Sequence, residues 1–221
     1  QKVIPGDSVL VSSQQSKAIC LVRDFVGGIS FEQLGVATKE FIERIENDAL
    51  SKNVLISLQE FWLDNSIALA EGLYELQCLG YAHGDLSLSN LRLDSTGKVK
   101  LMDLGLASEF GNCKGGTPEF FSPGHLVGDL NSRSDLFAVG LHLCYWVCGS
   151  QPLLGMTLKE VSNFLSDLEN TPHKMDEWLR DNLNNNVQDV PLDWHRLIRS
   201  CLVPEKEGGF EDLDELTENL E

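Results

Sequence analysis

The sequence has 221 residues, of which 42% are hydrophobic and 23% are charged. This composition suits a folded domain with a buried core and excludes a disordered tail. With 34 acidic and 17 basic residues, the formal net charge is −17, which argues against a general nucleic-acid or anionic-membrane binder. The longest apolar run, from Leu136 to Cys148, contains His142 and is too short to cross a bilayer, so it predicts a buried core helix.

Cysteine usage and the start of the chain bear on the compartment. The six cysteines form no C-x-x-C pair and mostly lie in apolar segments, where thiols pack as small hydrophobic groups. This usage predicts an intracellular, reducing compartment. The first residues lack the basic and apolar regions of a secretory signal, and because the chain opens with Gln1 we expect a processed or truncated product.

The first elements are predicted from periodicity. Two β-type runs, 9–12 and 18–25, are separated by a polar stretch and predict a short antiparallel hairpin that ends at Gly27-Gly28. Apolar residues then recur at helical spacing over 31–45 and again over 55–79. We therefore expect two helices, packed together, after the hairpin.

After residue 79, and up to Pro123, the apolar residues no longer follow helical spacing. Apolar and charged residues alternate from Leu91 to Leu101 around a Ser-Thr-Gly turn, which predicts a second hairpin. The glycine-rich and polar stretch 105–116 predicts a mobile loop. Everything after Pro123 is helical in character, and the last helix has an apolar face formed by Phe210, Leu213, Leu216 and Leu220. The expected fold class is α+β, predominantly helical with small β-hairpins.

Three polar side chains are candidates for chemistry. Asp85 and Asn90 lie in one turn, and Asp103 follows the second hairpin and precedes Leu104-Gly105, where glycine frees the backbone. Carboxylate and amide oxygens together with phosphate and water suit Mg²⁺, and a further carboxylate could receive a hydroxyl proton. Taken singly, each of these residues is more commonly a turn former.

Five motifs in chain order resemble those of the protein kinase superfamily, of the serine/threonine type. They are Leu21 to Gly28, His83 to Asn90, Asp103-Leu104-Gly105, Gly116 to Pro123, and Ser134 to Gly140. The resemblance covers nearly the whole chain and implies a kinase-like fold. Residues 1–28 would be a remnant of the N-lobe, with its last two strands and the hinge, and residues 29–221 the C-lobe. An unseen segment of the same protein would supply the missing part of the N-lobe.

The resemblance also implies roles for individual residues. Asp85 would be the base or orienting group for a substrate hydroxyl, Asn90 and Asp103 would hold magnesium with ATP, and Thr117 would lie beside a protein substrate. Asp135 would bind the backbone of the loop that carries Asp85. These roles describe a phosphotransferase that uses ATP and Mg²⁺.

Several positions depart from the family pattern in the nucleotide and phosphate sites. Ser87 stands where the resemblance implies a lysine that neutralises the transferring phosphate. Arg92 and Arg23 stand at the floor of the adenine pocket and before the hinge residues Asp24 and Val26, where apolar side chains are expected. The pattern indicates a filled or altered nucleotide pocket. The alternatives are that both arginines fold outward or that one stacks on the base.

Two further departures concern the C-lobe. Gly124 and Gly208-Gly209 replace the glutamate and arginine that the resemblance implies as a buried ion pair, and losing both partners is expected to leave no unpaired charge. Gly84 replaces an arginine that would receive an activation-loop phosphate, which disfavours control through that phosphate.

The sequence thus leaves three functional hypotheses. We favour a kinase-like domain with impaired phosphoryl transfer, a pseudokinase, that binds or scaffolds a protein partner. The intact set of Asp85, Asn90, Asp103 and Thr117 favours the alternative of an active serine/threonine-type protein kinase. A small-molecule phosphotransferase would share the His-Gly-Asp form of the loop, but Gly116-Thr117-Pro118 resembles enzymes that act on proteins.

Overall fold

The computed structural model describes most of the helical part of the chain and five short segments before it. The described residues are 3–4, 8–13, 16–22, 28–31, 33–34, 49–168, 170–171, 173–183 and 194–220. The first segments form an antiparallel sheet of β1 (Val3–Ile4), β2 (Ser8–Ser13) and β3 (Ser16–Val22), in which Val9 pairs with Val22. The predicted first hairpin is confirmed up to residue 22, and its last residues lie outside the described ranges.

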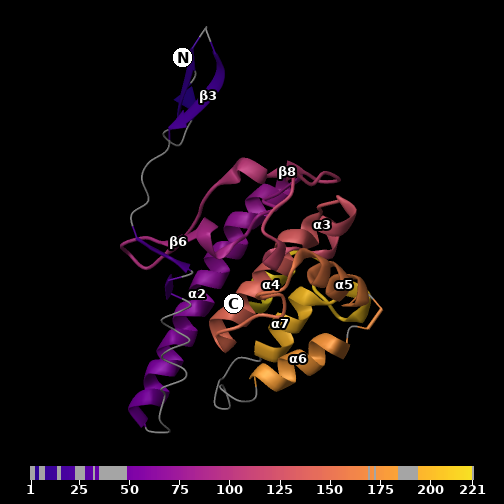
Figure 1. The fold of residues 1–221 in the computed structure, drawn as a ribbon. Helices are drawn as coiled ribbons and strands as arrows, with labels where there is room; N and C mark the ends of the chain where they lie inside the picture. Colours follow the sequence, from indigo (N-terminus) through magenta and orange to yellow (C-terminus); the bar gives the residue numbers. More distant parts are fainter. Residues whose placement is uncertain are drawn as a thin grey trace.

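A long helix, α2 (Ala49–Cys78), follows (Figure 1). It begins before the predicted start at residue 55 and ends in a turn where Gly80, with φ 78°, takes the left-handed conformation that glycine adopts without strain. The helix predicted over 31–45 lies largely outside the described residues, although Phe31, Gln33 and Leu34 are helical.

The predicted second hairpin is confirmed. β6 (Leu91–Leu93) pairs with β7 (Val99–Leu101), and β4 (Ile29–Ser30) adds a third antiparallel strand on the other side of β6. Asp94 closes the turn, because its Oδ1 accepts hydrogen bonds from Thr96 N at 2.8 Å and Lys98 N at 3.1 Å. These donors and the Thr96 hydroxyl lower the pKa of Asp94 to about 2.

The stretch predicted as a loop over 105–116 contains regular structure. A 3₁₀ turn, η2 (Leu104–Leu106), leads into β8 (Ser108–Glu109), which pairs with β5 (Tyr81–Ala82) directly after α2. The loop prediction is therefore wrong at β8. The turn that carries Asp85 follows β5, and the segment after Asp103 leads into β8. The pairing of these two strands therefore holds the turn and the segment close together.

Among the described residues after Pro123, the regular elements are helices, as predicted (Figure 1). They are α3 (Pro123–Val127), α4 (Ser132–Cys148), α5 (Leu158–Leu168), α6 (His173–Leu183), α7 (Trp194–Leu202) and α8 (Leu213–Leu220), with 3₁₀ turns η1 (Leu88–Asn90), η3 (Pro118–Phe120) and η4 (Glu205–Glu207). α4 is buried along nearly its whole length and confirms the predicted core helix. Within the described residues, no helix is long and apolar enough to span a membrane.

The core is built around α4, which packs between α2 and α7. Gly140 permits the contact with α7, since a Cβ there would lie 2.7 Å from the Cβ of Cys201. On the other side, Trp62 of α2 stacks on Trp146 of α4 with ring centroids 4.8 Å apart, and Phe31 packs 5.1 Å from Trp146. Such aromatic pairs add to the stabilisation from burying their large apolar surface.

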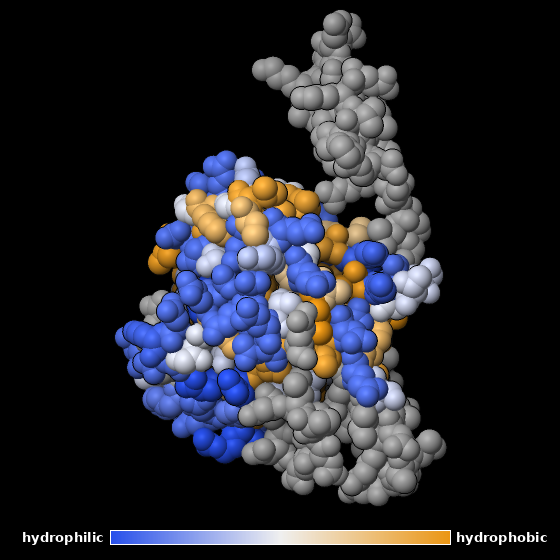
Figure 2. Space-filling view, turned by 180° about the vertical axis from the view of Figure 1, so that it is seen from behind, coloured by the Kyte–Doolittle hydropathy of each residue, from blue (hydrophilic) through white to orange (hydrophobic). Residues whose placement is uncertain are grey.

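The last helix covers the core with the face predicted from sequence. Leu213, Leu216 and Leu220 of α8, with Phe210 before it, are at most 4% exposed. The face of the molecule shown in Figure 2 is mostly hydrophilic, with apolar residues gathered toward its upper end. The α+β class is confirmed, and the division into residues 1–28 and 29–221 stays a prediction.

Candidate functional site

The turn between β5 and η1 is hydrogen-bonded to the buried first turn of α4. Asp135 accepts hydrogen bonds from His83 N at 2.6 Å and from Gly84 N at 3.0 Å, one to each carboxylate oxygen. Burial raises the pKa of Asp135, while the two backbone donors oppose that rise. This carboxylate therefore fixes the backbone immediately before Asp85.

His83 is a structural residue of the same turn. Its Nδ1 accepts a hydrogen bond from Asp85 N at 3.3 Å, so the ring proton lies on Nε2, which donates to the Met102 carbonyl at 3.1 Å. The side chain is fully buried. The ring thus joins the turn to the residue before Asp103, and with both nitrogens bonded it has a structural role.

Asp85 lies at the centre of a network of side-chain hydrogen bonds. Its Oδ1 accepts from the backbone N and the hydroxyl of Thr117, both at 2.8 Å, and its Oδ2 accepts from Asn90 Nδ2 at 2.9 Å. A carboxylate has about four lone-pair sites, so three bonds leave roughly one acceptor site. The carboxylate is held in one orientation and can still accept one further proton donor, such as a hydroxyl group.

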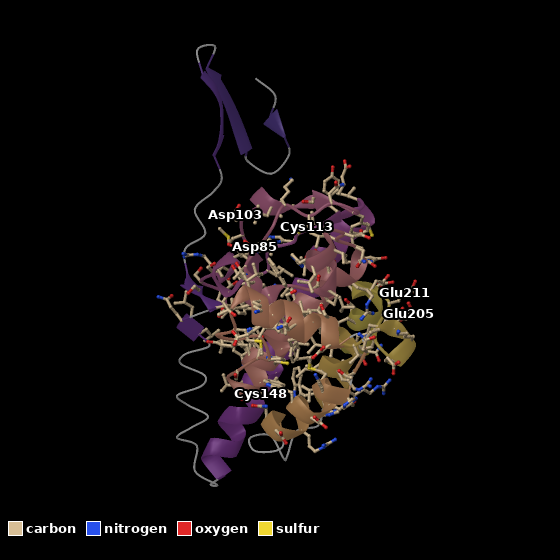
Figure 3. The ribbon with its side chains drawn as sticks, turned by 45° about the vertical axis from the view of Figure 1, so that its right-hand side comes forward. Asp85, Asp103, Cys113, Cys148, Glu205 and Glu211 are labelled. Atoms are coloured by element: carbon tan, nitrogen blue, oxygen red, sulfur yellow. The ribbon has the colours of Figure 1, made fainter. Side chains whose placement is uncertain are left out.

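Asn90 and Asp103 supply oxygen atoms beside this carboxylate. Asn90 uses its amide nitrogen to bond Asp85, both at Oδ2 and at the backbone carbonyl at 2.8 Å, so its Oδ1 is not the atom engaged there. Met102, which precedes Asp103, donates its N–H to the Asn90 carbonyl at 2.8 Å. Figure 3 shows Asp85 and Asp103 on the same part of the ribbon. Amide and carboxylate oxygens are ligands that Mg²⁺ accepts when phosphate and water complete its shell, so the residues fit that ion.

The backbone at Asp103 differs from the sequence-based expectation. Asp103 itself has φ 53°, the left-handed region, and it alone does so among the described non-glycine residues. The next glycine, Gly105, donates its N–H to Asp103 Oδ1 at 2.9 Å, and a Cβ at Gly105 would lie 2.9 Å from that oxygen. Gly105 therefore makes room for the carboxylate, and the unusual conformation is that of Asp103, an amino acid that tolerates it.

Ser87 is 5% exposed, and its hydroxyl lies 2.8 Å from the hydroxyl of Ser89. The side chain is short and its hydrogen bond stays within the turn. It carries no charge and cannot neutralise a phosphate as the implied lysine would.

Of the residues predicted to line the nucleotide pocket, only Arg92 lies within the described ranges. Arg92 lies on β6 between the buried Leu91 and Leu93, so its side chain leaves the opposite face of the strand, where Nη1 is 3.4 Å from the Gly28 carbonyl. Arg92 thus reaches the segment that follows the predicted hinge. Arg23, Asp24 and Val26 lie outside the described residues.

The segment that ends with η3 and α3 is fastened to the Asp85 turn at several points. Besides the bonds of Thr117, the backbone of Gly116 approaches so closely that a Cβ there would lie 2.6 Å from the Gly84 carbonyl oxygen. His125 donates from Nε2 to the same oxygen at 2.9 Å, while its Nδ1 accepts from Ser122 N at 3.0 Å. Burial lowers the pKa of His125, which favours this neutral form.

Sequence reasoning missed the role of His125. The ring stacks on Phe121 with centroids 4.5 Å apart and takes part in a capping box with Ser122 at the start of α3. A serine followed three residues later by a polar side chain is the signal of such a box and could have been recognised. The bond to Gly84 could not, because it joins residues far apart in the chain.

Comparison with known proteins agrees with this geometry. The family model of the protein kinase domain matches residues 10–208. A probable serine/threonine-protein kinase of Dictyostelium discoideum is 25% identical over 158 residues, which are 65% of this chain and 10% of the relative. The DNA damage-responsive serine/threonine-protein kinase RqkA of Deinococcus radiodurans is 33% identical over 95 residues, 39% of this chain and 14% of the relative.

A dual serine/threonine and tyrosine protein kinase of Tetraodon nigroviridis is 29% identical over 133 residues, which are 58% of this chain and 14% of the relative. The aligned part of the chain is thus only 10% to 14% of the length of these relatives. The match of the family model extends over most of the sequence, from the first hairpin to the turn before α8. The chain therefore belongs to the protein kinase family.

Proposed function

We propose that this chain is a kinase-like binding module whose own phosphoryl transfer is weak. The observation that carries the proposal is Ser87, which is buried and hydrogen-bonded to Ser89 at the position where a phosphate-neutralising cation is implied. Phosphoryl transfer depends almost entirely on positioning and charge stabilisation, so an absent cation lowers the rate while leaving the fold intact.

Arg92 gives independent support. Its guanidinium lies on the face of β6 opposite the buried leucines and contacts Gly28, at the end of the hinge segment. A charged group in the place of an apolar floor disfavours a buried adenine ring unless the charge is compensated. We expect nucleotide affinity to be reduced, and Arg23 to contribute if it faces the same space.

The remaining residues are arranged for a slow reaction of the family type. Asp85 would accept or orient the proton of a substrate hydroxyl with its remaining acceptor site, and Thr117 would hold that carboxylate in place. Asn90 and Asp103 would hold Mg²⁺, which when bound with ATP neutralises phosphate charge. Asp135 keeps the turn rigid from below.

The second candidate function is an active protein kinase, and the Asp85 network favours it. Three hydrogen bonds of 2.8–2.9 Å orient this carboxylate without any bound substrate. Preorganisation of this kind contributes to catalysis because little reorganisation is needed during the reaction. Under this hypothesis Ser87 would cost rate, and another cation would compensate.

ATP and Mg²⁺ binding separates the two functions. In a thermal-shift titration of the complete protein that contains this chain, we expect little Mg²⁺-dependent stabilisation by millimolar ATP and slow transfer to a general protein substrate. A turnover within the usual range of about 1–100 s⁻¹ that Asp85→Ala abolishes would establish the active enzyme and overturn the proposal.

A gain-of-function variant tests the role of Ser87 directly. Ser87→Lys restores the cation, and its flexible stem can extend from a buried backbone position toward solvent. We expect Ser87→Lys to raise phosphate transfer at least tenfold over the wild type. The matched control Ser87→Met, similar in length but uncharged, should leave transfer unchanged. Equal rates in all three proteins would contradict the explanation.

The partner and compartment are also proposals. We infer a protein partner, and the net charge of −17 disfavours nucleic acid. Cys78, Cys113, Cys144, Cys148 and Cys201 are free thiols, which supports an intracellular, reducing compartment. Burial raises the pKa of Cys148 to about 12, so its thiol stays protonated and unreactive.

A further inference from the structure

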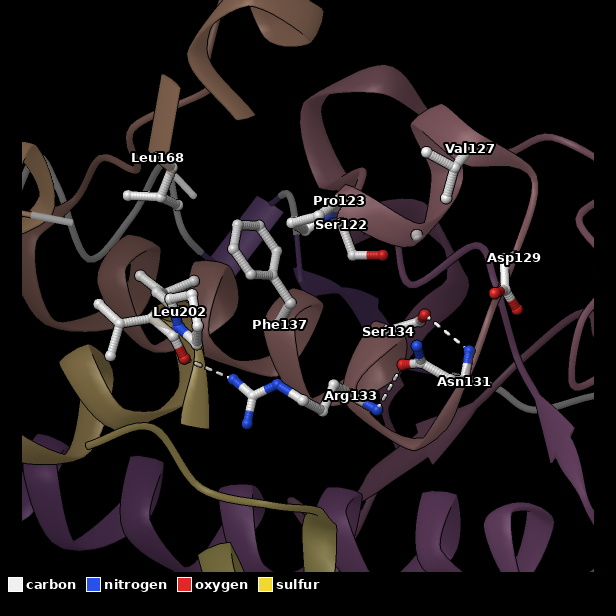
Figure 4. Close-up of a pocket in the computed structure, with 13 residues that line it drawn as sticks. Ser122, Pro123, Val127, Asp129, Asn131, Arg133, Ser134, Phe137, Leu168 and Leu202 are labelled. Carbon is white, nitrogen blue, oxygen red and sulfur yellow. Dashed lines mark hydrogen bonds between the residues drawn. The ribbon is translucent and has the colours of Figure 1, made fainter. Parts of the chain in front are cut away.

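A cavity of about 250 Å³ lies beside α3 and the start of α4 (Figure 4). Its walls come from α3, from the start of α4 and from the ends of α5 and α7. Most of the lining is apolar, with Val127, Phe137, Leu168 and Leu202 facing the space. Val127 is 77% exposed and marks the opening to solvent.

Arg133 is the one cation among the residues that line this cavity. Arg133 donates from Nη2 to the Val203 carbonyl at 2.5 Å, and its Nη1 is buried without a hydrogen-bond partner among the described residues. Among the described residues, no carboxylate lies within 4 Å of the guanidinium of Arg133. Burial lowers the pKa of Arg133, but an arginine keeps its charge. Glu205 and Glu215 act on the guanidinium from beyond 4 Å, so the cavity contains a partly buried cation with no carboxylate in direct contact.

This arrangement corrects the expectation that no unpaired charge would remain in this region. Gly124 lines the cavity, and a Cβ built on Gly209 would lie 3.0 Å from Arg133 Nη2. Arg133 thus occupies the space beside Gly209, where the resemblance implied the arginine of an ion pair. The carboxylate implied at residue 124 has no substitute. A Cβ at Gly124 would lie 2.5 Å from the Asp129 carbonyl, so the backbone leaves no room for one.

We propose that the cavity binds a small monocarboxylate with an apolar chain, whose carboxylate group is the counter-ion of Arg133. Guanidinium groups pair with carboxylates through charge-assisted hydrogen bonds, and a partly buried cation gains most from such a partner. The walls of Phe137, Leu168 and Leu202 would cover the apolar chain. A cavity of this kind, with a charged anchor and a few polar residues among mostly apolar walls, has the character of a small-molecule site.

Asp129 also lines the cavity but does not prevent this binding. It is an exposed residue, so water and salt screen its carboxylate. Figure 4 shows it beyond Val127, at the far end of the lining from the guanidinium. A ligand with its carboxylate at Arg133 would place only its neutral chain toward Asp129.

Hexanoate is a suitable probe, and hexanamide is its neutral match in size. We expect hexanoate, titrated into the 221-residue chain at constant ionic strength, to perturb the NMR methyl signals of Val127, Leu168 and Leu202 and to raise the melting temperature. Its few non-hydrogen atoms predict a millimolar Kd. Hexanamide should bind at least tenfold more weakly, because it cannot neutralise the guanidinium.

Two pairs of variants test the assignment. Val127→Glu places a carboxylate at the exposed opening and should weaken hexanoate binding at least fivefold, whereas Val127→Gln should not. Arg133→Met should abolish the preference for hexanoate over hexanamide, and Arg133→Lys should retain part of it. The Val127 pair remains informative if an Arg133 variant does not fold, since Val127 is exposed.

Three results would overturn the proposal. They are equal binding of hexanoate and hexanamide, signals that change away from the cavity, and no response to either compound up to 50 mM. Selective hexanoate binding that Val127→Glu weakens and Val127→Gln preserves would establish the site.

Discussion

Acidification should destabilise this protein through His142, a histidine at the centre of the core. The ring is fully buried in α4 and stacks on Phe120 with centroids 4.7 Å apart. Its Nε2 lies 2.6 Å from the Leu86 carbonyl, to which it donates, and its Nδ1 has no partner among the described residues. A second proton on Nδ1 would be buried without an acceptor, so burial lowers the pKa of His142 to about 4.

The magnitude follows from the difference between the folded and unfolded states. The unfolded chain binds the proton with a pKa near 6.5 and the folded chain with a pKa near 4, a difference of 6.5 − 4, or about 2.5. At 1.36 kcal/mol for each pKa unit, full protonation removes about 3 kcal/mol from the free energy of unfolding. Because the folded pKa is depressed, the contribution is fully present above pH 6.5 and is lost as the pH falls toward 4. About 2 kcal/mol should be gone at pH 5.

Urea unfolding followed by circular dichroism at pH 7.5 and pH 5 measures this loss, at pH values above the range in which most carboxylates titrate. His142→Gln keeps a donor for the Leu86 carbonyl but cannot take up the proton. The free energy of unfolding of this variant should therefore differ only slightly between pH 7.5 and pH 5, and His125 contributes to that small difference. His195→Gln, which removes an exposed histidine, is the control and should behave like the wild type. The reasoning is refuted if wild type and His142→Gln lose the same stability between the two pH values.

Three substitutions test other parts of the structure. Asp135→Ala removes the acceptor of two buried backbone N–H groups and should lower the free energy of unfolding, measured in urea, by about 2–5 kcal/mol. Asp135→Asn should lower it less, and an equal loss in both variants would contradict the hydrogen-bond explanation. Gly116 has φ 153°, and Gly116→Ala places a Cβ 2.6 Å from the Gly84 carbonyl oxygen. We expect faster hydrogen exchange at Thr117 N and unchanged exchange in α7. Unchanged protection of Thr117 would show that the contact is dispensable. Gly72→Ala, in an exposed turn of α2 where a Cβ meets nothing within 4 Å, should raise stability by about 0.5–1 kcal/mol, and a loss would mean that α2 is distorted there.

Much of the fold could be predicted from local sequence patterns. Strict alternation gave the β6–β7 hairpin, and apolar residues at helical spacing gave the buried face of α8. β8 was missed because a two-residue strand has no periodicity and its partner, β5, is distant in the chain. The early start of α2 was missed because its first turns carry polar residues as well as apolar ones.

The candidate site shows the same division. The order of Asp85, Asn90 and Asp103 in the chain was sufficient to expect them together, and the bonds of Asn90 to Asp85 and to Met102 bring them there. The left-handed conformation of Asp103 depends on a hydrogen bond from Gly105 that composition does not reveal. Arg133 and its cavity depend on which backbone segments meet around Gly124 and Gly209, and no local pattern encodes that meeting.

The conformation of Gly84 sets the cost of placing any side chain at this position of the loop. Its φ of 74° is strained for any residue with a side chain, and a Cβ there would lie 2.9 Å from Cδ1 of Leu130. An arginine at this position would hold a side chain in this strained conformation and would require the end of the Leu130 side chain to shift. A side chain at this position is therefore expected to cost about 1–3 kcal/mol of stability, most of it from the backbone conformation.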